Sequence, residues 1–240
     1  METISNNTIG SLVAANFKAA SVFQKFGIDF CCKGNMTISE ACAGQNLDKE
    51  KVEQEVLSVL ASNEKGAIDY NSWPIELLAD YIEKTHHRYV TEKIPELNIF
   101  LKKLCTVHGE RHPELLNIYE HFLDSAEELT IHMIKEENIL FPYIRSMVKA
   151  ENSQSEIDKP PFMTVQNPIA MMMKEHDTEG GRFREISKLS NGYTPPADAC
   201  TTYKVAFAML KEYEEDLHTH IHLENNILFP KAVSLESALV

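Results

Sequence analysis

One segment occurs twice in this chain, and it constrains the possible folds more than any other feature. The first copy runs from His132 to Pro142 and the second from His220 to Pro230. In both copies a glutamate follows the histidine by four residues, an asparagine stands at the same place, and the segment closes on Ile-Leu-Phe-Pro. Agreement over this length indicates two related halves, each contributing one copy.

The spacing of the repeated histidine and glutamate places both on one helical face. Residues i and i+4 lie side by side on an α-helix, so His132 can act with Glu136, and His220 with Glu224. Apolar residues continue the same two faces at steps of three, four or seven. They are Leu115, Ile118, Phe122, Leu129 and Leu140 on the predicted helix that contains the first copy, and Leu210, Leu217 and Leu228 on the one that contains the second. Both pairs therefore point into an apolar core.

A carboxylate in an apolar core needs a partner, because burying an unpaired charge is very costly. Two helices that direct glutamate and histidine at one interior indicate a bound cation there. Imidazole and carboxylate ligands without thiolate suit iron or manganese. The alternative is a pair of structural His–Glu hydrogen bonds, and the duplication of the motif favours the metal.

Long stretches without glycine or proline predict an all-α fold. We expect helices near residues 74–106, 113–149, 165–190 and 197–232, joined by short loops, and hence an antiparallel four-helix bundle. We expect residues 1–62 to form a separate small helical domain that carries the adjacent Cys31 and Cys32, residues 63–73 to form a linker, and residues 74–240 to form the bundle.

Within the small domain, a first helix is expected from Leu12 to Phe23, ending before Gly27. Thr37 and Glu40 have the spacing of a capping box, which begins a second helix, and Asp48 is a candidate cap for a third. The remaining cysteines, Cys42, Cys105 and Cys200, are expected to be small buried residues.

The composition excludes several classes of partner and compartment. The net charge of −13 disfavours nucleic acid and anionic lipid. No apolar run is long enough to span a bilayer, and the first residues lack the pattern of a signal peptide. Five cysteines, an odd number that includes an adjacent pair, favour reduced thiols. We therefore expect a cytoplasmic protein that binds neither nucleic acid nor membrane.

The other two bundle helices are expected to complete the metal centre. On the third helix, His176 lies on the inward face marked by Ile169, Met173, Gly180, Phe183 and Ile186. On the first helix, His86 is in phase with the upstream Leu78 and Ile82, whereas His87 is in phase with the downstream stripe Val90, Ile94, Leu97 and Leu101. Periodicity leaves both histidines as candidates, and the spacing of the two halves slightly favours His87.

Two further histidines, His218 and His222, are also four residues apart. They are offset by two residues from His220 and share their face with Lys211, Glu215 and Asn225. We therefore expect them on the solvated side of the fourth helix.

With these motifs in hand, the chain resembles the iron-sulfur cluster repair di-iron proteins over nearly its whole length. The resemblance is carried by the two repeated segments, by Gly-Ile-Asp-Phe-Cys-Cys-Lys-Gly from Gly27 to Gly34, by Glu-His-Asp from Glu175 to Asp177, and by the Pro-Pro and Cys-Thr-Thr residues between Pro195 and Thr202. It implies a small cysteine-bearing domain followed by a hemerythrin-like bundle.

The resemblance also implies a set of ligands and partners. The cofactor is expected to be two non-haem iron ions with oxo or hydroxo and carboxylate bridges. Glu136 and Glu224 would bridge the irons, Glu128 and Glu175 would lie near them, and His87 is preferred over His86. Similar proteins are homodimers that restore iron-sulfur clusters damaged by nitric oxide or oxidants. The implied iron-binding histidines are His87, His132, His176 and His220.

One departure from the oxygen-carrying hemerythrins bears on function. Those proteins have a second histidine on the third helix where this chain has Gly180. One fewer nitrogen ligand leaves coordination open for water, nitric oxide or an exchanging ion. This favours a reactive or iron-donating site over an oxygen carrier.

Our leading hypothesis is therefore repair of damaged iron-sulfur clusters, by iron donation or nitric oxide chemistry, with Cys31 and Cys32 as the active thiols. Lys33 and a nearby helix start are expected to lower the thiol pKa. Nitric oxide reductase-like turnover is a further possibility, and a sensor or iron store that binds nitric oxide or oxygen is the alternative. A ferritin-like oxidase is a third reading, carried by Glu83-x-x-His86 and Glu215-x-x-His218.

Overall fold

The computed structural model describes residues 4–61 and 68–239, which are almost entirely helical. No β-strand occurs in these residues, where Thr8 and Thr37 form an isolated bridge. None of the helices in the described part of the chain has both the length and the apolar character that crossing a bilayer requires. The all-α fold class expected from the sequence is confirmed.

The chain divides into two compact units. One comprises Met1–Ala79 with Ile221–Val240, and the other comprises Asp80–His220. The second boundary falls inside one continuous helix, so the last part of that helix belongs with the N-terminal segment. The linker proposed at 63–73 stays a prediction, because residues 63–67 lie outside the described residues.

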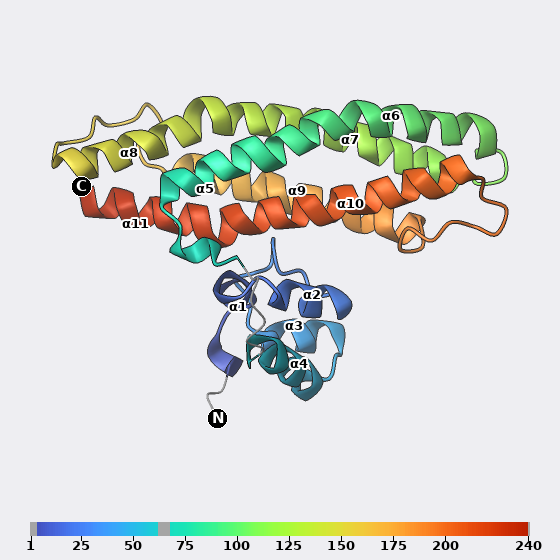
Figure 1. Ribbon diagram of the computed structural model, residues 1–240, viewed down its shortest axis with the longest axis horizontal. Helices are drawn as coiled ribbons and strands as arrows, with labels where there is room; N and C mark the ends of the chain where they lie inside the picture. The colour runs from blue at the N-terminus through green and yellow to red at the C-terminus, as the bar shows by residue number, and fades with distance from the viewer. Residues whose placement is uncertain (1–3, 62–67, 240) are drawn as a thin grey trace. The chain divides into compact units, whose positions relative to one another are not determined.

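Four short helices form the N-terminal part of the first unit, shown in Figure 1: α1 (Ile9–Ala15), α2 (Ala19–Lys25), α3 (Ile38–Gln45) and α4 (Lys49–Ala61). Single 3₁₀ turns precede and follow them, η1 (Ile4–Asn6) and η2 (Tyr70–Ser72). The single helix expected from Leu12 to Phe23 is wrong. Asn16 is extended, and its side chain accepts a hydrogen bond from the Lys18 amide, which separates α1 from α2.

The helix caps predicted from the sequence of this segment are confirmed. Thr37 and Glu40 form the complete capping box at the start of α3. Asp48 accepts the amide of Lys51 at the start of α4. Gly27 has a φ of 68° just after α2, a conformation that favours glycine over residues with a Cβ.

The long helices agree with the expected ranges to within a few residues at most of their ends. They are α5 (Ile75–Tyr81) continued by η3 (Ile82–His87) and α6 (Arg88–His108); α7 (Glu114–Lys135) continued by η4 (Glu136–Leu140) and α8 (Phe141–Ser153); α9 (Gln166–Leu189); and α10 (Thr201–Leu223) continued by η5 (Glu224–Leu228) and α11 (Phe229–Leu239). The fourth helix extends beyond the predicted end at 232.

Within residues 80–220, α7 packs against both α6 and α9, and Figure 1 shows the long helices running alongside one another. Part of the core between them is aromatic. Phe122 and Phe183 contact Tyr213, with ring centroids 5.9 and 5.7 Å apart respectively. Aromatic side chains of three helices therefore fill this layer of the bundle.

Three of the long helices contain a π-helical turn, and each turn coincides with a motif histidine or glutamate. These turns are η3, η4 and η5, which contain His87, Glu136 and Glu224 respectively. A π-turn accommodates one extra residue in a helix and is frequent at functional sites. In η3 it explains why Leu78 and Ile82 are in phase with His86 while Val90 is in phase with His87. Both stripes are buried because the helix changes phase between them.

Candidate metal centre

Six residues singled out by the sequence lie buried in the helical interior. Glu136 and Glu224 are 0% exposed, and none of the four histidines exceeds 2%. His87 is the last residue of η3, and His132 and His220 lie four residues before the start of η4 and η5. His176 lies inside the regular helix α9. The complete set is His87, His132, Glu136, His176, His220 and Glu224.

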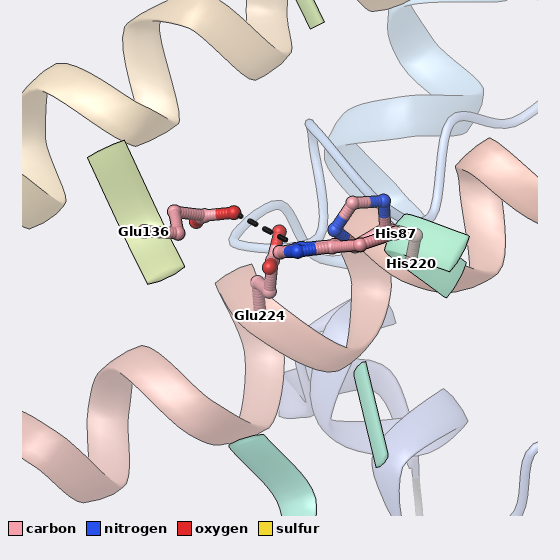
Figure 2. A group of neighbouring side chains, drawn as sticks. All are labelled: His87, Glu136, His220 and Glu224. Atoms are coloured by element: carbon pink, nitrogen blue, oxygen red, sulfur yellow. Dashed lines mark ion pairs between the residues drawn. The ribbon is translucent and has the colours of Figure 1, made fainter. Parts of the chain in front are cut away.

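The structure brings their ligand atoms into two overlapping groups. One group is His87, Glu136, His220 and Glu224, and the other is His132, Glu136, His176 and Glu224; in each, one atom per residue lies within 4.8 Å of all the others. Figure 2 shows the side chains of the first group pointing toward one another. Both glutamates belong to both groups, while each histidine belongs to one.

Individual distances show how close this arrangement is. Glu136 Oε2 lies 3.3 Å from His87 Nε2 and 3.3 Å from His132 Nε2. His132 Nε2 and His176 Nε2 are 3.0 Å apart. One carboxylate oxygen thus lies within 3.3 Å of histidines that belong to different groups.

The outer nitrogens of two histidines are held by carboxylates. His87 Nδ1 is 2.8 Å from Glu137 Oε1, and His132 Nδ1 is 2.8 Å from Glu175 Oε2. Such partners orient an imidazole, fix its tautomer and leave Nε2 to face a metal. The hydrogen bond with His132, together with Lys135, lowers the pKa of Glu175 to about 2 despite partial burial.

These observations satisfy the chemical requirements of a cation site. Buried carboxylates need compensating positive charge, and the imidazole nitrogens that converge with them are ligands for first-row transition metals. The oriented outer nitrogens supply the supporting contacts that such sites normally have. The residues present therefore fit a metal centre.

The two expected neighbouring carboxylates have different environments. Glu175 contacts His132, as described above. Glu128 is exposed and pairs with Arg182, with 3.0 Å between Nη2 and Oε1. Arg182 also binds Glu179, a buried carboxylate that accepts a hydrogen bond from Ser125 Oγ. The sequence analysis missed Glu179, whose pKa is raised by burial.

The inward face of the third helix departs from the expected stripe at one position, whereas Ile169 in its first turn is buried as predicted. Met172 is buried, whereas Met173 is 43% exposed, so the inclusion of Met173 in the inward stripe is wrong. His176 and Gly180 are buried as expected. The stripe returns to the predicted phase at His176.

His86 is buried beside the centre but is held in a different contact. Its Nδ1 lies 2.9 Å from Asp216 Oδ1, and its ring stacks on that of His220 with centroids 5.7 Å apart. The two carboxylates of the ferritin-like pattern turn elsewhere: Glu83 pairs with Arg145, and Glu215 is exposed. This arrangement disfavours the oxidase reading.

The prediction that His222 faces solvent is wrong. His222 is 0% exposed, and Phe17 and Phe30 pack against its ring with centroids 5.8 Å away. Burial lowers its pKa to about 4. Its partner His218 is half-buried. The N-terminal segment covers this face of the helix, which periodicity within the helix alone does not reveal.

The loop that carries Cys31 and Cys32 is attached to the same helix by two asparagines. Asn225 Nδ2 donates to the Cys31 carbonyl over 3.3 Å, and Asn226 Nδ2 donates to the Phe30 and Cys31 carbonyls over 3.3 and 3.4 Å. The expectation that Asn225 lies on a solvated face is therefore wrong, and no role was predicted for Asn226. The sequence does distinguish the two copies of the repeat at this place, because the first has Glu137 where the second has Asn225.

The thiols differ from expectation in two respects. The hydrogen bond with Cys32 and burial raise the pKa of Cys31 well above its usual value, so the expected lowering is wrong for this residue. Among the other cysteines, Cys42 is buried, Cys105 is half-buried and Cys200 is exposed, which corrects the expectation that all three are buried. Cys200 Sγ lies 3.3 Å from His108 Nε2.

Two known protein families match this chain, one over the short N-terminal helices and one over the long helices. Residues 5–60 match the ScdA_N model, a domain of unknown function (DUF542), and residues 79–232 match the hemerythrin HHE cation binding domain. The iron-sulfur cluster repair protein YtfE of Yersinia pseudotuberculosis is 34% identical over 95% of this chain and 97% of its own length. YtfE of Escherichia coli is 35% identical with the same coverage. The chain therefore belongs to the family of hemerythrin-like cation-binding proteins that includes the iron-sulfur cluster repair proteins YtfE.

Proposed function

We propose that this chain is a di-iron protein that repairs iron-sulfur clusters damaged by nitrosative or oxidative stress. The observation that carries the proposal is the sharing of Glu136 and Glu224 by two groups of ligand atoms. Two positions bridged by carboxylates, with histidines at either end, suit a pair of iron ions. The curated relatives are named for cluster repair, which supports this activity and damaged iron-sulfur proteins as clients.

The protein's own residues have separable roles in this proposal. His87, His132, His176 and His220 hold the ions, and Glu137 and Glu175 orient two of those imidazoles. Gly180 offers no side-chain ligand on α9, so the ion held by His132 and His176 retains room for an exchanging ligand. Iron bound here supplies either ions for transfer to a damaged cluster or a centre that reacts with nitric oxide. Cys31 and Cys32 engage the client or the transferred ion.

Metal analysis tests the cofactor. The purified protein is expected to contain about two irons per chain, as a carboxylate-bridged two-metal site requires. The double variant His132→Ala/His220→Ala is expected to lose them, while His121→Ala, a half-buried histidine outside both groups, retains them. Zinc, or a single iron, in the wild-type protein would contradict the di-iron proposal.

A reconstitution assay tests the function. An iron-sulfur enzyme damaged by nitric oxide is incubated with the iron-loaded protein, and its recovered activity is measured against the iron-free protein. Recovery that depends on bound iron and on Cys31 and Cys32 supports repair. Tight nitric oxide or oxygen binding without recovery would favour the sensor or store instead. Catalytic consumption of nitric oxide with an electron donor would indicate a reductase.

The expected homodimer is a separate proposal, supported by the family resemblance. Light scattering of the iron-loaded chain measures its mass directly. A mass equal to that of one chain, 27.3 kDa, would contradict it.

A further inference from the structure

A second group of metal-binding atoms lies outside the buried centre. Asp29, Cys31 and Cys32 each offer one ligand atom, and these three atoms lie within 4.8 Å of one another. Cys31 is buried, while Asp29 and Cys32 are half-buried, so the group has a solvent-accessible side. From this geometry we propose that Asp29, Cys31 and Cys32 bind a thiophilic divalent cation, Fe²⁺ in the working protein. The identity of that ion rests on the proposed repair function.

The sulfur atoms have the separation that a shared ion requires. Cys31 Sγ and Cys32 Sγ are 3.7 Å apart. With metal–sulfur bonds of about 2.3 Å, that separation corresponds to a sulfur–metal–sulfur angle of about 107°, close to tetrahedral. The side chains therefore do not need to rearrange to place both sulfurs on one ion.

The carboxylate fits the same position. Asp29 Oδ1 lies 3.3 Å from Cys31 Sγ. With a metal–oxygen bond of about 2.0 Å, this distance gives an oxygen–metal–sulfur angle of about 100°. Two thiolates and one carboxylate suit Fe²⁺ or Zn²⁺, and three protein donors leave a four-coordinate ion one exchangeable position. A site of this kind can accept an ion and pass it on.

The loop is held in shape before any ion binds. Asp29 Oδ1 accepts the main-chain amides of Cys31 and Cys32 over 3.2 and 2.9 Å, which fixes the carboxylate against the thiol-bearing backbone. Asn225 and Asn226 hold the carbonyl of Cys31 from the other side. Because these hydrogen bonds already order the loop, little conformational entropy is lost when the three ligands bind an ion.

A bound cation would offset the effect that burial has on ionisation of the Cys31 thiol. A buried thiol resists ionisation, and the hydrogen bond to Cys32 and burial raise the pKa of Cys31 accordingly. A coordinated thiol loses its proton to solvent when the metal–sulfur bond forms, because the cation supplies the compensating charge.

Its attachment places this site on the helix that carries the buried centre. Asn225 and Asn226 follow Glu224 directly in η5. The cysteine loop that would bind the ion is therefore held by η5, which also contains the proposed ligand Glu224. We infer that the loop is an acceptor station for iron that leaves, or is loaded into, the buried centre.

Cobalt provides a direct probe, because thiolate–cobalt bonds give an intense charge-transfer absorption that histidine and carboxylate ligands lack. Co²⁺ is titrated into the full-length, iron-loaded protein under a phosphine reductant. One ion per chain is expected to bind with this absorption. Cys31→Ser and Cys32→Ser should each reduce it by about half, and the double variant should abolish it, since each thiolate contributes independently.

Asp29→Asn is expected to keep the absorption but weaken Co²⁺ binding by about tenfold, as loss of one ligand charge predicts. Cys42→Ser and Cys200→Ser are matched controls that leave both the absorption and the affinity unchanged. Absence of the charge-transfer band in the wild-type protein, or its survival in the double variant, would overturn the proposal.

A measurement on the wild-type protein alone guards against misfolded variants. Zn²⁺ is expected to slow alkylation of Cys31 and Cys32 at least tenfold, as read by peptide mass spectrometry, but not alkylation of Cys200. Equal rates with and without Zn²⁺ would also overturn the proposal. Both readouts report thiolate coordination only, so they can fail while the repair assay succeeds, and succeed while it fails.

Discussion

Two of the proposed ligand imidazoles are each held by a single neighbouring carboxylate. Glu137 and Glu175 bind the outer nitrogens of His87 and His132. Glu137 directly follows Glu136 in the repeat, so its place is visible in the sequence once the helix phase is known. Glu175 lies on another helix from His132, and their pairing depends on how α7 packs against α9.

Glu175→Ala is expected to weaken iron binding by about 10–100-fold, because His132 loses the partner that orients its ring. Glu128→Ala is the matched control, since Glu128 binds Arg182 on the surface and should leave iron affinity unchanged. Competition with a chromophoric chelator measures both. Equal iron affinity in the two variants would contradict this assignment.

Cys200 is expected to be the most reactive of the cysteines outside the loop. Hydrogen bonds from the Tyr203 and Thr202 amides lower its pKa, and its side chain is exposed. Burial raises the pKa of Cys42. Because the thiolate is the nucleophile, iodoacetamide should modify Cys200 at least about tenfold faster than Cys42. Peptide mass spectrometry over time gives both rates, and the reverse order would count against the structural reading.

Among the helical elements, the π-helical turns hold three of the proposed ligands, namely His87, Glu136 and Glu224. The additional residue in η3 keeps Leu78 and Ile82, earlier in the helix, and Val90, later in it, in the core. Both His86 and His87 are buried between them. The sequence contained this information as a change of phase. A regular helix would have buried one of the two histidines and exposed the other.

Deletion of the exposed Thr85 tests this account. The deletion is expected to convert η3 to regular α-helix, keeping His87 in phase with both apolar stripes and moving His86 to the surface. Iron binding should persist, while His86 becomes reactive toward diethyl pyrocarbonate. Circular dichroism checks that the helix content is retained. Loss of iron together with a still-protected His86 would show that the turn has another role.

Across the whole molecule, residues far apart in the chain are joined at η5. The side-chain oxygen of Asn226 occupies the space that a Cβ would need at Gly10 and at Gly34. Its amide reaches the Phe30 and Cys31 carbonyls, and it lies 3.0 Å from His222 Nδ1. These contacts attach the cysteine loop to the C-terminal half of the second repeat.

Asn226→Ala is expected to destabilise the protein by about 1–3 kcal/mol, because several partly buried hydrogen bonds are lost together. The same change should speed alkylation of Cys31. Asn138→Ala is the matched control: Asn138 holds the equivalent place in the first repeat, but its exposed side chain bonds only locally to the Ile134 carbonyl. Thermal unfolding and alkylation rates compare the two variants. Equal effects would show that Asn226 does not anchor the loop.

The linear pattern of residues was sufficient for the all-α class, for the approximate extent of the long helices and for the burial of His132, Glu136, His220 and Glu224. Helical periodicity is a local property, so it can be read from neighbouring residues. The pairing of His132 with Glu175 and the burial of His222 beneath Phe17 and Phe30 were decided by tertiary structure. Each depends on which distant segment covers a given helix face, and the period of a helix carries no record of its neighbour.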